Sequence, residues 1–300
     1  DIESGQLLGL IGESGSGKTM LCRSLVGTLN RRGAYIESGH LEFDGIDLVN
    51  ATKQQWRGIR GKKIGYIPQS ALAGPNPVIT IGDQLAEAIK QGEKLDGDTI
   101  RKRSIELLEM VQIRRPEIVL KQYSYQLSGG MKQRVMIACA IAQQPKLVVA
   151  DEPTTGLDVT VQAEIMELLK DIRNNLNTSI ILVSHDLQLI NSVCDDIVVM
   201  HAGATVEKLP SDRIERAAHP YTHALYNSRI DLVEPRGKLV TIKGQPPTVG
   251  AWPTGCRFAD RCDYVLPGCR TAAVIPLEKV EGNHVTACIR HKEIFQGAKK

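Results

Sequence analysis

Three short apolar runs along the chain each end in polar residues. The runs are LLGLI at 7–11, LVVA at 147–150 and IILV at 180–183. Continuous apolar runs of this length are typical of strands that are buried on both faces, as in parallel sheets covered by helices. In open α/β sheets, ligands bind beyond the carboxyl ends of the strands. The pattern therefore predicts an α/β fold in which the polar groups after the three strands converge on one ligand.

The first run leads into GESGSGKT, residues 12–19, and a helical pattern follows. This stretch fits G-x-x-x-x-G-K-S/T, in which glycines let the backbone curl and direct its N–H groups at a phosphate, and the helix start adds partial positive charge. Lys18 is predicted to reach the β- and γ-phosphates of a nucleotide, and Thr19 to bind Mg²⁺. The alternative, a chance glycine-rich turn, is disfavoured by the strand before the stretch and the helix after it.

Two adjacent acids, Asp151 and Glu152, follow the second run. Neighbouring residues at a strand end point to opposite faces, so the two carboxylates can have different roles. We predict that Asp151 holds the magnesium shell and that Glu152 polarises an attacking water. The stretch LSGGMKQRV, residues 127–135, is a second glycine-bearing turn that opens a helix, with Ser128 as its predicted N-cap.

Composition and charge narrow the class of protein. The chain has 300 residues, of which 42% are hydrophobic and 24% charged, as in ordinary globular proteins, and its net charge of +3 implies no nucleic-acid partner. The longest unbroken apolar run, residues 135–142, is far shorter than the ~20 residues of a membrane span. No signal peptide is visible. Because the chain starts at Asp1, without a methionine and close to its first strand, we expect a further N-terminal segment to precede it.

In their order along the chain, the motifs resemble those of the nucleotide-binding subunit of ABC transporters. They are GESGSGKT, YIPQ with Gln69, LSGGMKQR, LVVADEPTTGLD and VSHD, within roughly residues 1–228. The resemblance implies a P-loop ABC ATPase core with a parallel sheet, plus a helical subdomain at about 75–142 that faces a membrane subunit. It also implies that two such domains pair head to tail, with ATP between the Lys18 loop of one and the Ser128–Gly130 turn of the other.

The same resemblance implies roles for individual residues. Glu152 is the implied general base and His185 a contact to the γ-phosphate, while Asp158 communicates across the dimer. Magnesium is implied to involve Thr19, Asp151 and Gln69. The implied ATP-binding residues are Gly12, Glu13, Ser14, Gly15, Ser16, Gly17, Lys18, Thr19, Met20, Gln69, Ser128, Gly129, Gly130 and Asp158. The aromatic residue that stacks on adenine in the family is implied to lie upstream of residue 1.

Beyond Asp186 the chain becomes rich in Pro, Gly and Thr, as in HPYTHAL at 219–225 and KGQPPTVGAWPTGC at 243–256, which predicts loops. Both stretches resemble the C-terminal extension of ATPase subunits from oligopeptide and dipeptide importers, a group that also carries nickel and other small solutes. We therefore predict a nucleotide-binding domain at 1–228 and a small, loop-rich C-terminal cysteine domain at 229–300.

Seven cysteines in a chain without a visible export signal favour a reducing compartment over disulfides. Cys22, Cys139 and Cys194 stand singly among apolar residues and are predicted to be buried. The other four have five, six and eighteen residues between them and so lack the close pairs of structural zinc sites. This spacing favours a four-iron, four-sulfur (4Fe–4S) cluster in a structural role over zinc or unligated thiols, and related importer subunits bind such a cluster. The predicted ligands are Cys256, Cys262, Cys269 and Cys288.

These features predict an ATPase coupled to transmembrane transport, which uses ATP and Mg²⁺ to energise the import of di- and oligopeptides. The implied partners are a second ABC ATPase subunit, for which the subfamily favours a different chain, two membrane permease subunits and an extracytoplasmic solute-binding protein. The implied location is the cytoplasmic face of the bacterial inner membrane. Import of nickel or another small solute, a non-transport ABC ATPase and a regulator that does not hydrolyse ATP are the alternatives. Glu152 and His185 favour hydrolysis, and the HPYT-plus-cysteine tail favours transport; the sequence does not name the solute.

Overall fold

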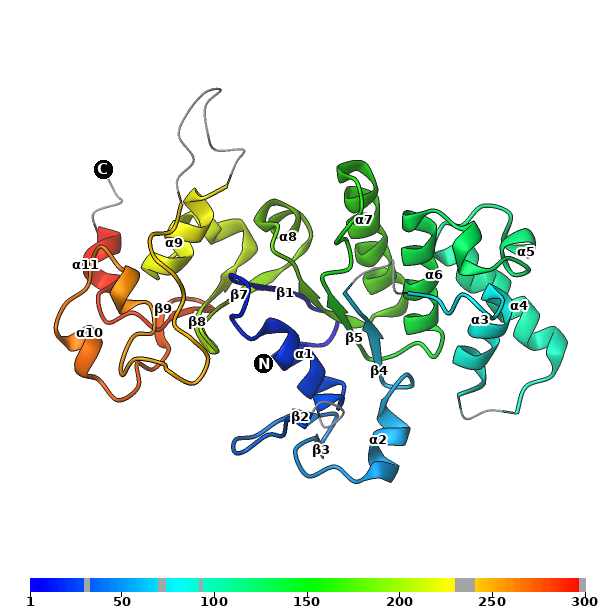
Figure 1. Ribbon diagram of the computed structural model, residues 1–300, viewed down its shortest axis with the longest axis horizontal. Coiled ribbons are helices and arrows are strands. Elements are labelled where there is room, and N and C mark those ends of the chain that lie inside the picture. Colours follow the sequence, from blue (N-terminus) through cyan, green and yellow to red (C-terminus); the bar gives the residue numbers. More distant parts are fainter. Residues whose placement is uncertain (30–32, 70–73, 92–93, 230–240, 297–300) are drawn as a thin grey trace. The chain divides into compact units, whose positions relative to one another are not determined.

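The structure, a computed structural model, describes residues 1–29, 33–69, 74–91, 94–229 and 241–296. The chain divides into two compact units. Unit 1 comprises Asp1–Leu7 and Thr19–Val183, and unit 2 comprises Leu8–Lys18 and Ser184–Lys300. Each unit is therefore built from two separate stretches of the chain, which can be followed by colour in Figure 1.

Unit 1 contains three parallel strands, β4 (Ile64–Ile67), β5 (Leu147–Asp151) and β6 (Ser179–Val183). β5 lies in the middle, with Leu147 opposite Ile64 on one side and opposite Ser179 on the other. Every residue of β5 and β6 is buried, as expected for apolar strands that are covered on both faces. The strands predicted at 147–150 and 180–183 are confirmed, and each is one residue longer than its apolar run.

Most of the longer helices of unit 1 begin at a residue whose side chain caps the helix, and they bury their apolar faces. Thr80 caps α3, whose Ile81, Leu85 and Ile89 recur every four residues and are fully buried. Figure 1 shows α3, α4, α5 and α6 side by side, within the segment 75–142 for which a helical subdomain is implied.

The elements outside the sheet are α1 (Lys18–Leu25, which starts at the last residue of unit 2's first stretch), β2 (Glu42–Phe43), β3 (Ile46–Asp47), α2 (Lys53–Ile59), α3 (Ile81–Lys90), α4 (Gly97–Met110), α5 (Pro116–Val119), the 3₁₀ turn η3 (Ser124–Gln126), α6 (Gly129–Ile141) and α7 (Val159–Leu176).

Unit 2 contains strands in the order β1-β7-β8-β10-β9. They are β1 (Leu7–Ile11), β7 (Asp196–His201), β8 (Ala204–Pro210), β10 (His284–Thr286) and β9 (Glu278–Glu281). β1 and β7 are parallel and the other pairs antiparallel. Every residue of β1 is buried, so the strand predicted at 7–11 is confirmed. β7 and β8 are joined by Ala202 and Gly203, whose φ angles of +48° and +80° fit a two-residue turn that follows the strand twist.

Short helices and loops make up the rest of unit 2. The helices are α8 (Leu187–Val193), the 3₁₀ helix η4 (Ser211–Arg216), α9 (Pro220–Asn227), the 3₁₀ helix η6 (Ala259–Arg261), α10 (Gly268–Thr271) and α11 (His291–Gln296). Apart from η6 and α10, residues 241–277 are turns and loops, as the Pro- and Gly-rich composition predicts.

The division into domains 1–228 and 229–300 stays a prediction. Residues 230–240, directly after that boundary, lie outside the described residues, as do residues 92–93 of the implied helical segment. Within the described ranges, no helix combines the length and the apolar character that crossing a membrane requires.

Candidate active site

The loop of residues 12–18 runs from the end of β1 into α1, and its glycines take conformations that other residues rarely adopt. The φ angles of Gly12, Gly15 and Gly17 are +150°, +80° and +101°. A Cβ atom on Gly12 would lie 2.1 Å from the carbonyl oxygen of Met200 in β7. Glycine therefore allows the loop to pass close to the β7 backbone.

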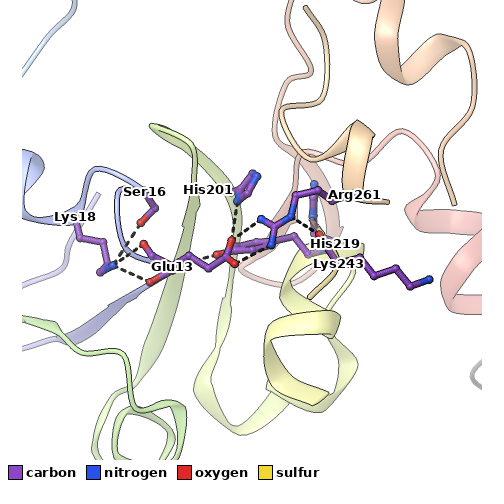
Figure 2. Close-up of polar contacts among 9 residues, drawn as sticks. Glu13, Ser16, Lys18, His201, His219, Lys243 and Arg261 are labelled. Atoms are coloured by element: carbon purple, nitrogen blue, oxygen red, sulfur yellow. Dashed lines mark hydrogen bonds and ion pairs between the residues drawn. The ribbon is translucent and has the colours of Figure 1, made fainter. Parts of the chain in front are cut away.

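Lys18 is 6% exposed and turns back over this loop. Its Nζ donates to the carbonyl oxygens of Gly12 at 2.7 Å and Glu13 at 3.0 Å, as Figure 2 shows. Ser16 Oγ lies 3.5 Å from the same ammonium group. The loop thus holds a positive charge against its own backbone. Of the neighbouring predicted residues, Ser14 and Met20 are exposed.

The predicted magnesium ligands Thr19 and Asp151 lie together in unit 1. Thr19 Oγ1 donates to Asp151 Oδ1, and the Tyr66 hydroxyl donates to Asp151 Oδ2, each at 3.3 Å. Asp151 is 1% exposed, and burial raises the pKa of its carboxyl. A buried carboxylate beside a hydroxyl group is the kind of hard oxygen donor that Mg²⁺ prefers, so these residues fit the ion.

Glu152 belongs to a separate hydrogen-bonded group in the same unit. Its Oε2 accepts from Gln69 Nε2 at 2.9 Å and from Thr155 Oγ1 at 3.0 Å. Its backbone φ is +49°, a left-handed conformation that is uncommon for a residue with a side chain. The adjacent acids Asp151 and Glu152 therefore have different hydrogen-bond partners, and their different roles stay a prediction.

Tyr66 and Thr155 are not predicted from the sequence patterns. Both stand inside motifs that the patterns do identify, three residues before Gln69 and three after Glu152. Their place inside these motifs is the sequence signal that could have identified them, and the structure shows their hydroxyl groups at hydrogen-bonding distance from the predicted acids.

The predicted turn at 128–130 opens α6. Ser128 is the N-cap, as predicted, and its Oγ accepts from the Met131 N–H at 3.3 Å. A Cβ atom on Gly130 would lie 2.9 Å from Val161 Cγ1 in α7. Since that distance is shorter than real Cβ contacts, glycine at this position lets the start of α6 pack against α7.

Asp158 and His185 both lie at the beginning of helices. Asp158 caps α7, with its Oδ1 accepting from the Val161 N–H at 3.0 Å. His185 is exposed in the turn between β6 and α8, and the next residue, Asp186, caps α8. The roles implied for Asp158 in dimer communication and for His185 at the γ-phosphate stay predictions.

The four clustered cysteines line one cavity of unit 2. Cys256, Cys262, Cys269 and Cys288 surround about 20 Å³, close to the space that one water molecule needs. Burial raises the pKa of Cys256 to about 11 and that of Cys288 to about 12. Burial also raises the pKa of Cys262, although the Tyr264 N–H donates to its sulfur at 3.4 Å. Among the described residues, no group of three or more His, Cys, Asp or Glu is arranged to hold a single metal ion. We call residues 241–296 the cysteine module.

The three single cysteines differ slightly from the prediction. Cys22 and Cys194 are buried, as predicted. Cys139 is only half-buried, because its side of α6 lines a groove together with Met136 and Ala140.

Two family models match the chain. The ABC transporter family matches residues 1–155, and the C-terminal region of oligopeptide/dipeptide transporters matches residues 206–269. The chain is 39% identical to the oligopeptide transport ATP-binding protein AppD of Bacillus subtilis, over 97% of this chain and 89% of AppD. It is 42% identical to a putative peptide import ATP-binding protein of Brucella abortus, over 94% of this chain and 85% of that protein.

Solved structures show the same fold. The dimeric, post-hydrolysis ATP-binding cassette MJ0796 with ADP and Pi has a TM-score of 0.61 at 26% identity, over 70% of this chain and 88% of that chain. The cbiO1 protein of Clostridium perfringens, part of the transporter complex cbiONQ, has a TM-score of 0.63 at 27% identity, over 71% and 80%. By its motifs, its fold and these relatives, the chain belongs to the ABC transporter family, among the ATP-binding proteins that carry the oligopeptide/dipeptide transporter C-terminal region.

Proposed function

We propose that this chain binds and hydrolyses ATP to energise the import of di- and oligopeptides through a membrane ABC transporter. The observation that carries the enzymatic part is the pair of polar groups at the end of β5. Asp151 is held by two hydroxyl groups there, and Glu152 by Gln69 and Thr155. Relatives named for peptide import and the match at residues 206–269 support the solute class.

In this proposal Thr19, Asp151 and Gln69 hold the Mg²⁺ that accompanies ATP. The ion supplies positive charge that neutralises the phosphate oxygens during transfer. Lys18 and Thr19 are consecutive in the chain, so the loop lysine and the hydroxyl ligand serve the same nucleotide. Gln69 donates to Glu152 and thereby joins the metal ligands to the general base.

Glu152 accepts the proton of the attacking water. Gln69 and Thr155 both donate to Oε2, which fixes the orientation of the carboxylate that is proposed to act as the base. His185, exposed after β6, contacts the γ-phosphate, and Lys18 balances the charge on the β- and γ-phosphates.

A second ATPase subunit completes the site in this proposal. Its Ser128–Gly130 turn supplies a helix N-terminus, which favours a phosphate because its N–H groups point outward and carry partial positive charge. Ser128 is exposed in this chain, as a residue that meets a partner's nucleotide must be. Asp158, at the N-terminus of α7, carries the communication between the two sites.

The four thiols that line one cavity are proposed to hold a 4Fe–4S cluster. The donor set fits such a cluster because four thiolate ligands are what a cubane requires, and N–H groups directed at the sulfurs stabilise thiolates. When bound, the cluster cross-links a segment with little apolar core of its own.

The proposed location is the cytoplasmic face of the bacterial inner membrane, on two permease subunits that work with a solute-binding protein. A groove in unit 1 includes residues of the helical segment 75–142, which is proposed to face a permease subunit. It has a volume of about 370 Å³ and is lined by residues of β4, α3 and α6, including Tyr66, Gln84 and Val135.

Reconstitution tests this function. The chain is co-expressed with its neighbouring permease and ATPase subunits, placed in vesicles, and supplied with the binding protein and labelled dipeptides or oligopeptides. We expect peptide uptake that requires ATP and that disappears in Lys18→Ala. Nickel uptake in place of peptide uptake would overturn the solute class, and ATP turnover without any permease association would overturn the transport function.

A further inference from the structure

Glu13 puts a negative charge inside the loop that is proposed to bind phosphates, and the structure pairs it with Arg261. Arg261 Nη1 donates to Glu13 Oε2 at 2.6 Å, and Nη2 donates to Oε1 at 2.8 Å (Figure 2). The two residues are 248 positions apart. We call these two parallel hydrogen bonds the Arg261 fork. Because Arg261 directly precedes Cys262, the fork connects the loop to the cysteine module.

Arg261 is itself held in place. Its side chain is 4% exposed, its Nε donates to the Lys243 carbonyl oxygen at 2.7 Å, and its guanidinium carbon lies 5.6 Å from the centre of the Phe258 ring. Because Nε is fixed by a hydrogen bond and one face of the guanidinium by an aromatic ring, the remaining N–H donors point in one direction. Glu13 therefore meets a rigid partner.

Contacts reach the main chain of Glu13 as well. Its N–H donates to the Tyr221 hydroxyl at 2.9 Å, and its carbonyl oxygen accepts from Lys18 Nζ at 3.0 Å. His201 Nδ1 lies 3.7 Å from Glu13 Oε2, but burial lowers the pKa of this histidine to about 4. The histidine is therefore neutral at pH 7, and Arg261 is the charge that balances Glu13.

We infer that Arg261 is a positioning residue for ATP binding, which neutralises Glu13 and fixes the loop in the form that holds Lys18. Without this arginine, the Glu13 carboxylate repels the triphosphate, and the Glu13 carbonyl loses its fixed place beside the lysine. Through Arg261, the cysteine module thereby contributes to ATP binding at the loop. This inference rests on the proposed phosphate-binding role of residues 12–19.

A double-mutant cycle on the purified complex tests the link. The measurement is the equilibrium affinity for a fluorescent ATP analogue with Mg²⁺, in the parent, Arg261→Gln, Glu13→Gln and the double variant. We expect Arg261→Gln to weaken binding about tenfold in the parent and less than about twofold in the Glu13→Gln background, because the lost partner is the same. In steady-state turnover, KM for ATP rises while kcat stays within about twofold, as expected for lost binding.

Matched variants separate the outcomes. Arg270→Gln, which breaks the exposed pair with Asp260 in the same module, is expected to leave the affinity unchanged. Arg261→Lys keeps the charge but not the fork, so it should bind ATP a few-fold more weakly even if Arg261→Gln folds poorly. Parental affinity in both Arg261 variants, or an equal loss in both Glu13 backgrounds, would overturn the inference. If Lys18→Ala also binds normally, the loop assignment itself has failed.

Discussion

At the scale of single residues, the buried Asp151 carboxylate lowers the stability of the folded protein when it is charged. Its pKa is raised mainly by burial, against the opposing hydrogen bonds from Thr19 and Tyr66. Because the folded pKa lies above the unfolded one, stability falls as pH rises between the two values and stays lower above both. In the proposed magnesium site, a divalent ion at this carboxylate would stabilise the charged form, so Mg²⁺ binding would be coupled to folding.

Asp151→Asn is therefore expected to raise the melting temperature of the metal-free protein at pH 7 and to abolish the further rise that Mg²⁺ and ATP give the parent. The amide has no charge to bury and is a poor magnesium ligand. Scanning calorimetry in EDTA and in Mg²⁺–ATP measures both effects. Asp96→Asn, at the exposed N-cap of α4, is the control that should leave both unchanged. A variant that kept the full Mg²⁺–ATP shift would contradict the metal assignment.

Glu152→Gln is expected to lower steady-state hydrolysis by roughly 10²–10⁴-fold while ATP still binds, because a general base is lost and the Lys18 loop is untouched. Turnover and nucleotide affinity are measured on the assembled complex. Glu164→Gln, which breaks the ion pair of α7 with Arg134, is the matched control. Hydrolysis within about threefold of the parent would rule out Glu152 as the base.

At the scale of elements, the position of α6 against α7 fixes the turn at Ser128. The two helices approach closely at Gly130 and Val161, and the N-cap hydrogen bond sets the first turn of α6. A displacement of α6 therefore moves the Ser128 turn directly.

Gly130→Ala tests this dependence. The added Cβ at 2.9 Å from Val161 Cγ1 forces the helices apart, which is expected to cost about 1 kcal/mol of stability and to reduce ATP turnover in the complex. Gly97→Ala, in the first turn of α4 with no atom within 4 Å of the new Cβ, should be neutral or stabilising. Equal effects of the two substitutions on turnover would refute the coupling. Urea denaturation and ATPase assays supply the two measurements.

The elements differ in how far the sequence predicts them. β1, β5 and β6 are continuous apolar runs, and Ser128 stands where an N-cap is required. The sequence pattern of each of these segments is therefore sufficient to predict its structure. β10 is a short, partly polar strand whose Val285 pairs with Lys208 in β8, and no local periodicity indicates that pairing. The Arg261 fork on Glu13 is equally remote from any local pattern, because it depends on the tertiary placement of two loop residues.

At the scale of the whole molecule, the proposed cluster makes the fold of the cysteine module dependent on its four thiols. Replacing Cys256, Cys262, Cys269 or Cys288 with serine is expected to remove iron, about four atoms per chain in protein prepared without oxygen, and to make the module sensitive to protease. Cys262→Ser should also weaken ATP binding, because loosening the chain at Cys262 also loosens Arg261, the residue directly before it. Cys194→Ser, outside the module and buried, is the control that should keep its iron. Stoichiometric zinc without iron, or full iron in the serine variants, would exclude the cluster.

The isolated chain is expected to hydrolyse ATP slowly, because in the proposed composite site a second subunit supplies its own Ser128 turn. Turnover per chain should rise with protein concentration or with added partner subunits, and a Ser128→Ala partner should fail to stimulate it fully. Rates are measured across a dilution series. Fast turnover that is independent of concentration and partners would contradict the composite site.

The pairing of β1 with β7 has a consequence for biosynthesis. Leu8 lies opposite Asp196, so 188 residues (196 − 8) separate the two partners. At roughly 5–20 residues per second on the ribosome, the first strand waits about ten to forty seconds for its neighbour, while much of residues 19–183 has already emerged. Arg261 is translated later still. A nascent chain therefore completes the contacts of the 12–18 loop near the end of synthesis, and a prematurely terminated chain that lacks β7 cannot form them.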